Sequence, residues 1–125
     1  MNIQTNFSLK KYNTFGIEVK AKQFVSVTSI AELKEVLTKN DDIFILGGGS
    51  NMLLTQDIEK IVVHVNLKGR EIVEENDDFA IVKAQAGENW HEFVLWCIDQ
   101  NFGGIENLSL IPGNVGTTPI QNIGA

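Results

Sequence analysis

The sequence has little of several residue types, and each scarcity excludes a class of protein. Its single cysteine, Cys97, allows no intrachain disulfide and no cysteine zinc cluster, which fits a reducing compartment. No apolar run approaches the ~20 residues that span a bilayer, and the N-terminus lacks the pattern of a signal peptide. Basic residues number 10 against 16 acidic ones, which argues against a nucleic-acid partner and an electrostatic membrane anchor. We therefore expect a cytoplasmic protein with no nucleic-acid or membrane partner.

The sequence does contain enough apolar material for one domain, with 43% hydrophobic residues in a chain of 125. Residues 24–65 predict strand, helix, strand, loop and strand in that order. Ser29 and Glu32 form a capping box, and the apolar residues after Ser29 have helical spacing. The continuous apolar run 43–46 is typical of a strand buried on both faces, and 61–65 predicts another strand. The helical stripe consists of Ile30, Leu33, Val36 and Leu37.

A different pattern begins after Lys68-Gly69. Residues 71–75 and 79–86 predict an antiparallel hairpin whose acidic side chains are most simply solvated. A helix is predicted over 88–101, ended by Gly103-Gly104. We place a subdomain boundary near residues 67–70, and neither part is large enough for us to expect independent folding. The apolar face of the second helix consists of Trp90, Phe93, Val94, Cys97 and Ile98.

Three consecutive glycines begin the segment 47–51, directly after the strand predicted over 43–46. Glycine lets the backbone take positive φ and approach a ligand, and successive amides form an anion-binding nest. A P-loop would need a lysine that is absent before Lys60, and a dinucleotide fingerprint would need a glycine in place of Met52. Only about nine residues separate Asn51 from the next strand, which is too few for a crossover helix. The segment therefore predicts a strand–loop–strand phosphate loop, with a tight structural turn as the alternative.

The segment 111–125 contains both prolines, three of the 11 glycines and no charged residue. An uncharged loop punctuated by glycine and proline suggests backbone packed against something large. Polar groups in an apolar frame suit a flat heteroaromatic ligand with a polar rim. A buried interdomain loop is the alternative, because such a loop also has to satisfy its backbone groups. The polar side chains are those of Thr117, Thr118, Gln121 and Asn122.

The histidines and the cysteine carry no recognisable catalytic or metal-binding pattern. His64 and His91 have no cysteine or second histidine at ligand spacing, so we expect packing or surface hydrogen bonds rather than a metal site. Cys97 lies on the apolar face of the predicted helix and is expected to be an inert core residue. No Ser/His/Asp or Cys/His arrangement is identifiable.

Four segments together resemble a known family. They are Asn-Thr-Phe-Gly at 13–16, Ile-Leu-Gly-Gly-Gly-Ser-Asn at 45–51, Ala-Gly-Glu-Asn-Trp-His at 86–91 and the segment 111–125. In their order and spacing these segments resemble the UDP-N-acetylenolpyruvoylglucosamine reductases of peptidoglycan precursor synthesis. The resemblance covers essentially the whole chain, but only the first part of a family chain. Thr117-Thr118 stands where relatives often carry the smaller Gly or Ser, a mild departure that leaves backbone donation possible.

The resemblance implies an α+β architecture, the FAD-binding fold of the vanillyl-alcohol-oxidase (PCMH) type. Residues 1–67 would be the first FAD-binding α/β subdomain, and 68–125 the truncated beginning of the second. The segment 47–51 matches the family's pyrophosphate loop, and 111–125 matches its second flavin-binding segment. A single FAD molecule would bind to both of these segments. The cofactor-binding residues expected are Gly47, Gly48, Gly49, Ser50, Asn51, Pro112, Gly113, Val115, Gly116, Thr117, Thr118, Gln121, Asn122, Gly124 and Ala125.

Members of this family use NADPH and FAD to reduce the enolpyruvyl group of a nucleotide sugar, giving UDP-N-acetylmuramate. The family's proton-donating serine, its catalytic glutamate and arginine, and its substrate-binding C-terminal domain would lie downstream of Ala125. We therefore expect no catalytic residue, no reductase activity and weak or absent FAD retention from these 125 residues alone. The alternatives are part of another flavin oxidoreductase of the same fold, such as a sugar or lactone oxidase, and a non-catalytic flavin-binding module.

Overall fold

The computed structural model describes residues 1–121 and 123. Three residues expected to bind the cofactor, Asn122, Gly124 and Ala125, lie outside the described residues. The chain forms two compact units, Met1–Leu67 and Lys68–Ala125.

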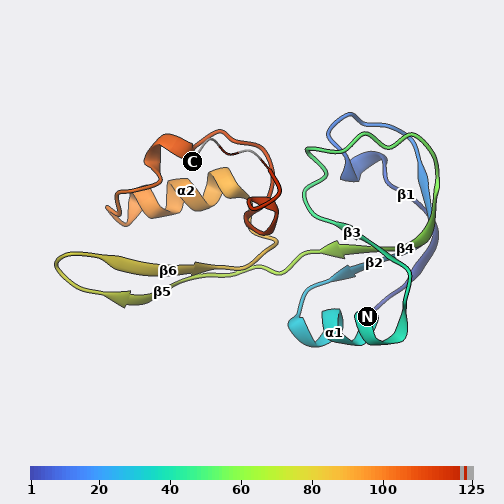
Figure 1. The fold of residues 1–125 in the computed structure, drawn as a ribbon, viewed down its shortest axis with the longest axis horizontal. Helices are drawn as coiled ribbons and strands as arrows, with labels where there is room; N and C mark the ends of the chain where they lie inside the picture. The colour runs from blue at the N-terminus through green and yellow to red at the C-terminus, as the bar shows by residue number, and fades with distance from the viewer. Residues whose placement is uncertain (122, 124–125) are drawn as a thin grey trace. The chain divides into compact units, whose positions relative to one another are not determined.

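The first unit is built on a four-stranded mixed sheet of order β1-β2-β4-β3. The first strand runs antiparallel to the second, whereas the second and third both run parallel to the fourth. β4 therefore lies between β2 and β3, and the helix α1 connects these two strands. The strands are β1 (Gln4–Ser8), β2 (Lys20–Val27), β3 (Ile43–Leu46) and β4 (Ile58–Val65), and the helix is α1 (Ile30–Lys39) (Figure 1).

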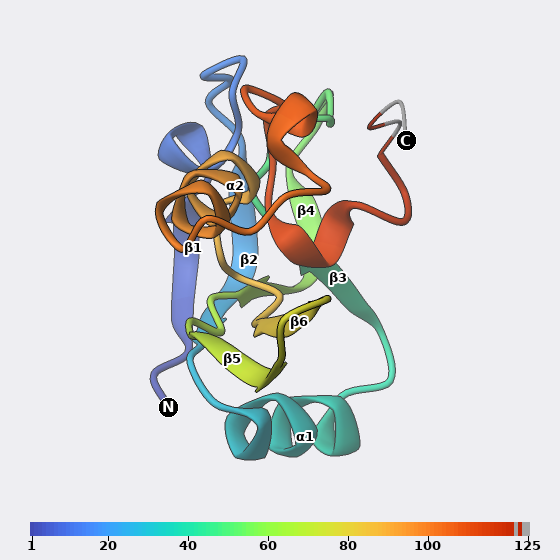
Figure 2. The same cartoon turned by 90° about the vertical axis from the view of Figure 1, so that its left-hand side faces the viewer.

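Both faces of this sheet are covered. Alternation along β2 and β4 sends Val25 and Val63 into a cluster with Val36 of α1, and sends Phe24 and Val62 into a second cluster. The second cluster is completed by residues of β1 and of the loops 9–19 and 47–57, and its aromatic centre is a stacked pair of Phe7 and Phe24 rings. The helix and these loops thus lie on opposite sides of the sheet (Figures 1 and 2).

Two expectations for this unit were wrong in part. The run 43–46 is a strand, but β3 is an edge strand rather than one buried on both faces, and Ile45 is 51% exposed. In α1 the apolar stripe is narrower than predicted, because Val36 is buried while Ile30 and Leu37 are exposed. The edge position explains the exposure in β3, because within this sheet the strand has a neighbour, β4, on one side only.

The capping box at α1 is present, but the Glu32 side chain bonds to the residue before the N-cap and not to the N-cap itself. Ser29 Oγ accepts the Glu32 N–H at 3.2 Å, as the pattern predicts. The Glu32 carboxylate instead accepts the N–H of Thr28 at 2.8 Å and its hydroxyl at 3.1 Å. These bonds from Thr28 lower the pKa of Glu32 below its ordinary value.

The second unit begins with an antiparallel hairpin, as predicted. It consists of β5 (Arg70–Glu75) and β6 (Ala80–Ala84). The Asn76 side chain accepts the N–H groups of Asp78 and Phe79 at 2.8 and 2.9 Å, which closes the turn. Figure 2 shows this hairpin nearly end-on.

The helix α2 (Trp90–Asp99) follows, with Asn89 as its N-cap. It buries Trp90, Phe93, Val94 and Cys97, while Ile98 is exposed. Its end differs from the prediction, because the helix already ends at Asp99 and Asn101, before Gly103-Gly104, takes the left-handed conformation with φ of 61°. The Asn101 N–H donates to Ile98 O and the Phe102 N–H to Cys97 O, each at 2.9 Å, which is a Schellman motif.

Three short 3₁₀ turns complete the described chain: η1 (Lys10–Tyr12), η2 (Glu106–Leu108) and η3 (Val115–Thr117). Across residues 1–121 and 123, no helix has both the length and the apolar character required to cross a membrane.

Candidate functional site

The glycine-rich loop leaves β3 at the carboxyl edge of the parallel strands. Leu46, the last residue of β3, is paired with His64 near the end of β4. Ligands of open α/β sheets bind outside the carboxyl ends of parallel strands. The residues 47–51 therefore occupy the position in this sheet where a ligand loop is expected.

Gly49 fixes how this loop packs. Its φ is +70°, and a Cβ at this position would lie 1.9 Å from the carbonyl oxygen of Tyr12. The Thr14 N–H donates to Gly49 O at 3.0 Å. The structure thus brings together two motifs that are far apart in the sequence, the segments 13–16 and 47–51.

Unpartnered amides make this loop suitable for an anion. Among the residues that the structure describes, the backbone N–H groups of Gly48, Gly49 and Asn51 have no hydrogen-bond partner. Gly49 is also buried as a residue. Because buried backbone donors are almost always paired, such amides are available to the oxygens of a phosphate group.

The second predicted segment pairs with the fourth motif of the sequence. Trp90 N–H donates to Gly113 O at 3.0 Å, Val115 N–H to Glu88 O at 2.8 Å, and Gly116 N–H to Ala86 O at 2.9 Å. A Cβ at Gly116 would lie 2.7 Å from the Ala86 Cβ, so the two backbones approach closely only because this residue is glycine. The segments 86–91 and 113–116 therefore pack directly against each other and are joined by backbone hydrogen bonds.

The polar side chains of this segment hold the loop together. The Thr117 hydroxyl lies 2.9 Å from Asn114 O and 2.8 Å from Gln121 Oε1, and the Thr118 hydroxyl donates to Val115 O at 2.9 Å. Gln121 Nε2 donates to Pro112 O at 3.0 Å. Their donor hydrogens are therefore directed into the loop itself. These side chains therefore hold the backbone of the loop in a fixed shape.

Exposed apolar side chains flank both loops, and sequence reasoning missed them. The four most exposed large hydrophobic residues of the described chain, at 66–86% exposure, lie within the segments 13–16 and 111–125 or within two residues of 47–51 and 111–125. Apolar exposure of this kind marks ligand or protein contact surfaces. These residues are Phe15, Leu53, Leu110 and Ile120.

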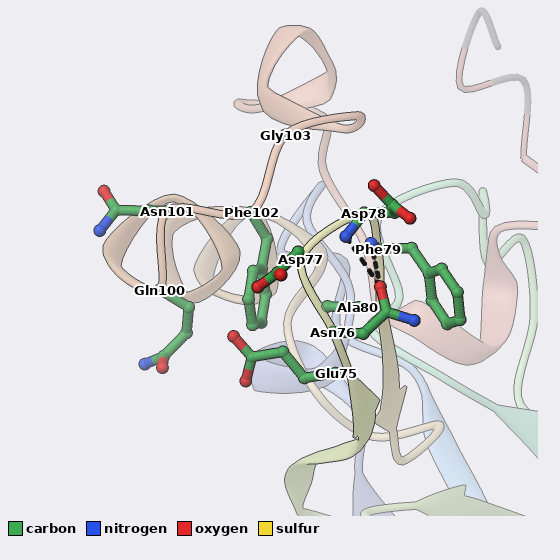
Figure 3. A pocket seen from close by; sticks show the side chains of 10 residues that line it. All are labelled: Glu75, Asn76, Asp77, Asp78, Phe79, Ala80, Gln100, Asn101, Phe102 and Gly103. Atoms are coloured by element: carbon green, nitrogen blue, oxygen red, sulfur yellow. Dashed lines mark hydrogen bonds between the residues drawn. The ribbon is translucent and has the colours of Figure 1, made fainter.

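A separate hollow of about 460 Å³ lies within the second unit, between the hairpin turn and the end of α2. Figure 3 shows Phe102 pointing into it beside the carboxylates of Glu75 and Asp77. Carboxylates repel phosphate groups, and this hollow contains none of the predicted cofactor-binding residues. It is therefore not the candidate site.

The histidines and the cysteine make the ordinary contacts expected of them. His64 Nδ1 lies 2.9 Å from Ser26 Oγ, and His91 Nδ1 accepts the N–H of Leu110 at 2.9 Å. Cys97 is 2% exposed, and burial raises the pKa of its thiol. In the described part of the chain, no group of three or more His, Cys, Asp or Glu side chains is arranged to hold a metal ion.

Comparison with known proteins identifies the relatives of this chain. A family model described as FAD binding domain matches residues 21–125. The UDP-N-acetylenolpyruvoylglucosamine reductase of Flavobacterium johnsoniae is 69% identical over 127 residues, covering 100% of this chain and 38% of the relative. The enzyme of the same name from Pseudomonas aeruginosa is 44% identical over 129 residues, with the same coverage of 100% and 38%. The chain thus spans 38% of the length of these relatives.

A solved structure has the same fold. The UDP-N-acetylenolpyruvylglucosamine reductase from Thermus caldophilus matches with a TM-score of 0.66 and 24% identity, over 92% of this chain and 39% of that chain. The α+β architecture of the PCMH-type FAD-binding fold is therefore confirmed, and so is the resemblance seen in the sequence. Because the family model covers most of the sequence, the chain belongs to the FAD binding domain family, with FAD as its cofactor.

Proposed function

We propose that this chain is the FAD-binding portion of a UDP-N-acetylenolpyruvoylglucosamine reductase. The observation that carries the proposal is the 69% identity to the Flavobacterium johnsoniae reductase across the whole chain. Such an enzyme, with NADPH as reductant, acts on a nucleotide sugar in the cytoplasm. When FAD is bound, it supplies the hydride chemistry of the reaction.

The described residues fit FAD at both of the predicted loops. The N–H groups of Gly48, Gly49 and Asn51 suit the pyrophosphate, since they lack other partners among the described residues. The second segment offers a preformed loop with an apolar flank, which suits a flat ring system. We assign cofactor binding to the residues predicted from the sequence: Gly47, Gly48, Gly49, Ser50, Asn51, Pro112, Gly113, Val115, Gly116, Thr117, Thr118, Gln121, Asn122, Gly124 and Ala125.

We assign residues 1–67 to a first FAD-binding subdomain and 68–125 to the beginning of a second. The residues that protonate and hold the nucleotide sugar would lie in the part of the relatives that this chain does not span, since it covers 38% of their length. The role of the 125 residues is therefore to bind and orient the cofactor, and the chain alone is expected to give no turnover.

A chimaera tests this function. The corresponding segment of the Flavobacterium johnsoniae reductase is replaced by residues 1–125, and the purified protein is assayed for bound FAD and for NADPH oxidation dependent on the UDP-sugar. FAD content and turnover close to those of the parent enzyme are expected, whereas a chimaera carrying Gly49→Ala should lose FAD. A chimaera that holds FAD but does not turn over would favour another flavin oxidoreductase. Loss of FAD from the chimaera would overturn the flavin site itself.

A further inference from the structure

Buried polar side chains are rare in the described chain, and their positions are informative. Only Asn13 and Glu88, at 6% and 8% exposure, are both polar and buried among residues 1–121 and 123. Each lies next to one of the two candidate loops, and neither was predicted to contact a cofactor. Burying an amide or a carboxylate is unfavourable unless it is hydrogen-bonded, so the bonds that these side chains make indicate what they do.

Asn13 shapes the backbone that supports the glycine-rich loop. Its Nδ2 donates to Leu9 O at 2.8 Å and to Ile17 O at 3.0 Å, and its Oδ1 accepts the Ile17 N–H at 2.9 Å. Three bonds from one side chain close the loop 9–17 on itself. The next residue, Thr14, donates its N–H to Gly49 O at 3.0 Å. Asn13 thereby fixes the backbone segment against which Gly49 packs.

Glu88 performs the equivalent task in the second unit. Its Oε1 accepts the Gly69 N–H at 2.7 Å, and Oε2 lies 3.9 Å from Arg70 Nε. Its own carbonyl oxygen accepts the Val115 N–H at 2.8 Å. The side chain therefore anchors the loop 86–89 to the start of β5, while the main chain of the same residue holds the segment 113–116.

We propose that Asn13 and Glu88 are positioning residues, each of which fixes the backbone of one cofactor loop without touching the cofactor. This inference rests on the proposed FAD-binding function. Asn13 directs its bonds at backbone groups of the loop 9–17, and Glu88 directs one oxygen at the Gly69 N–H and the other toward Arg70. An apolar side chain of similar size could fill either space but would leave those backbone groups unpaired, and the loop would lose its shape.

The test for Glu88 compares two substitutions in the 125-residue chain. Glu88→Gln keeps an oxygen for the Gly69 N–H, whereas Glu88→Leu removes it. Glu88→Leu should weaken FAD binding about tenfold in a fluorescence titration, as expected for an unpaired buried donor. It should also speed amide hydrogen exchange at Val115 and Gly116 in FAD-free protein about tenfold. Glu88→Gln should restore both within threefold, and Glu74→Leu on exposed β5 is the matched control.

The test for Asn13 separates positioning from stability. Asn13→Asp keeps the shape of the side chain but turns two donated bonds into oxygen–oxygen contacts. It should weaken FAD binding about tenfold at a temperature where the chain stays folded. Val36→Ala destabilises the same unit from the opposite face of the sheet and should leave the affinity for FAD unchanged. Equal loss of affinity in both variants would mean that Asn13 only stabilises the unit.

Further outcomes distinguish failure of this inference from failure of the proposed function on which it rests. If the unmodified chain shows no FAD affinity, the same variants are titrated in the chimaera, and exchange at Thr14, Val115 and Gly116 still tests the positioning role; a chimaera without FAD counts against the proposed function and not against the positioning role. If Glu88→Leu does not fold, Glu88→Asp replaces it, and faster exchange at Val115 with unchanged exchange at Val94 and Cys97 supports the proposal. Unchanged exchange and unchanged affinity in the variants would overturn it.

Discussion

At the scale of single residues, Gly49 has two separate reasons to be glycine. Its φ of +70° is a conformation that costs other residues about 1–2 kcal/mol, and a Cβ would overlap the carbonyl oxygen of Tyr12. We predict that Gly49→Ala lowers the free energy of unfolding of the first unit by about 2–4 kcal/mol, combining the strain of the backbone with overpacking. Urea denaturation followed by far-ultraviolet circular dichroism measures this change.

Gly103→Ala is the matched control. A Cβ at Gly103 meets nothing within 4 Å, and no left-handed φ is required there. This substitution should leave stability unchanged or raise it by up to about 1 kcal/mol, because alanine restricts the unfolded chain. If the two variants behave alike, the contact between Gly49 and Tyr12 does not constrain the loop.

The sequence predicted the glycine-rich loop but not its support. Three consecutive glycines indicate close backbone approach, yet the group approached is the carbonyl of Tyr12, which belongs to a distant segment. The direction of the threonine hydroxyls could not be predicted either, since Thr117 and Thr118 donate to the carbonyl oxygens of Asn114 and Val115 at the start of η3. Composition reveals which donors are present, whereas tertiary structure decides which of them remain available.

At the scale of whole elements, the end of α2 depends on one residue in the left-handed conformation. Asn101 has φ of 61° and completes the Schellman motif with Phe102. Asn101→Ala should lower the free energy of unfolding by about 1 kcal/mol, because alanine is strained in this conformation. Asn101→Gly should match or exceed the native stability. Thermal unfolding of both variants provides the comparison, and an Asn101→Ala variant as stable as the native chain would contradict it.

Secondary structure followed from local pattern in this chain, but burial did not. The predicted hairpin and the strand at 61–65 were confirmed, because alternation and turn chemistry are local properties. The run 43–46 was correctly predicted as a strand, yet its place at the sheet edge follows from β4 entering between β2 and β3. Helix α2 could have ended at either glycine, but Asn101 tolerates positive φ and stops the helix earlier.

At the scale of the whole molecule, the two units differ in how completely their sheets are covered. β2 and β4 lie inside a four-stranded sheet, and their apolar residues are buried on both faces. All six residues of β5 are exposed, and this strand pairs only with β6 among the described residues. A two-stranded hairpin is marginally stable by itself, so local opening should cost much less in the second unit.

Native-state amide hydrogen exchange measures this difference directly. The amides of Phe24, Val25, Val62 and Val63 should exchange only through global unfolding of the first unit, whereas those of β5 and β6 should exchange orders of magnitude faster. Val94 and Cys97, which are buried on α2, distinguish opening of the hairpin alone from opening of the whole second unit. Protection of β5 equal to that of β4 would contradict the prediction, because it would mean that the exposed hairpin is stabilised to the level of a covered sheet.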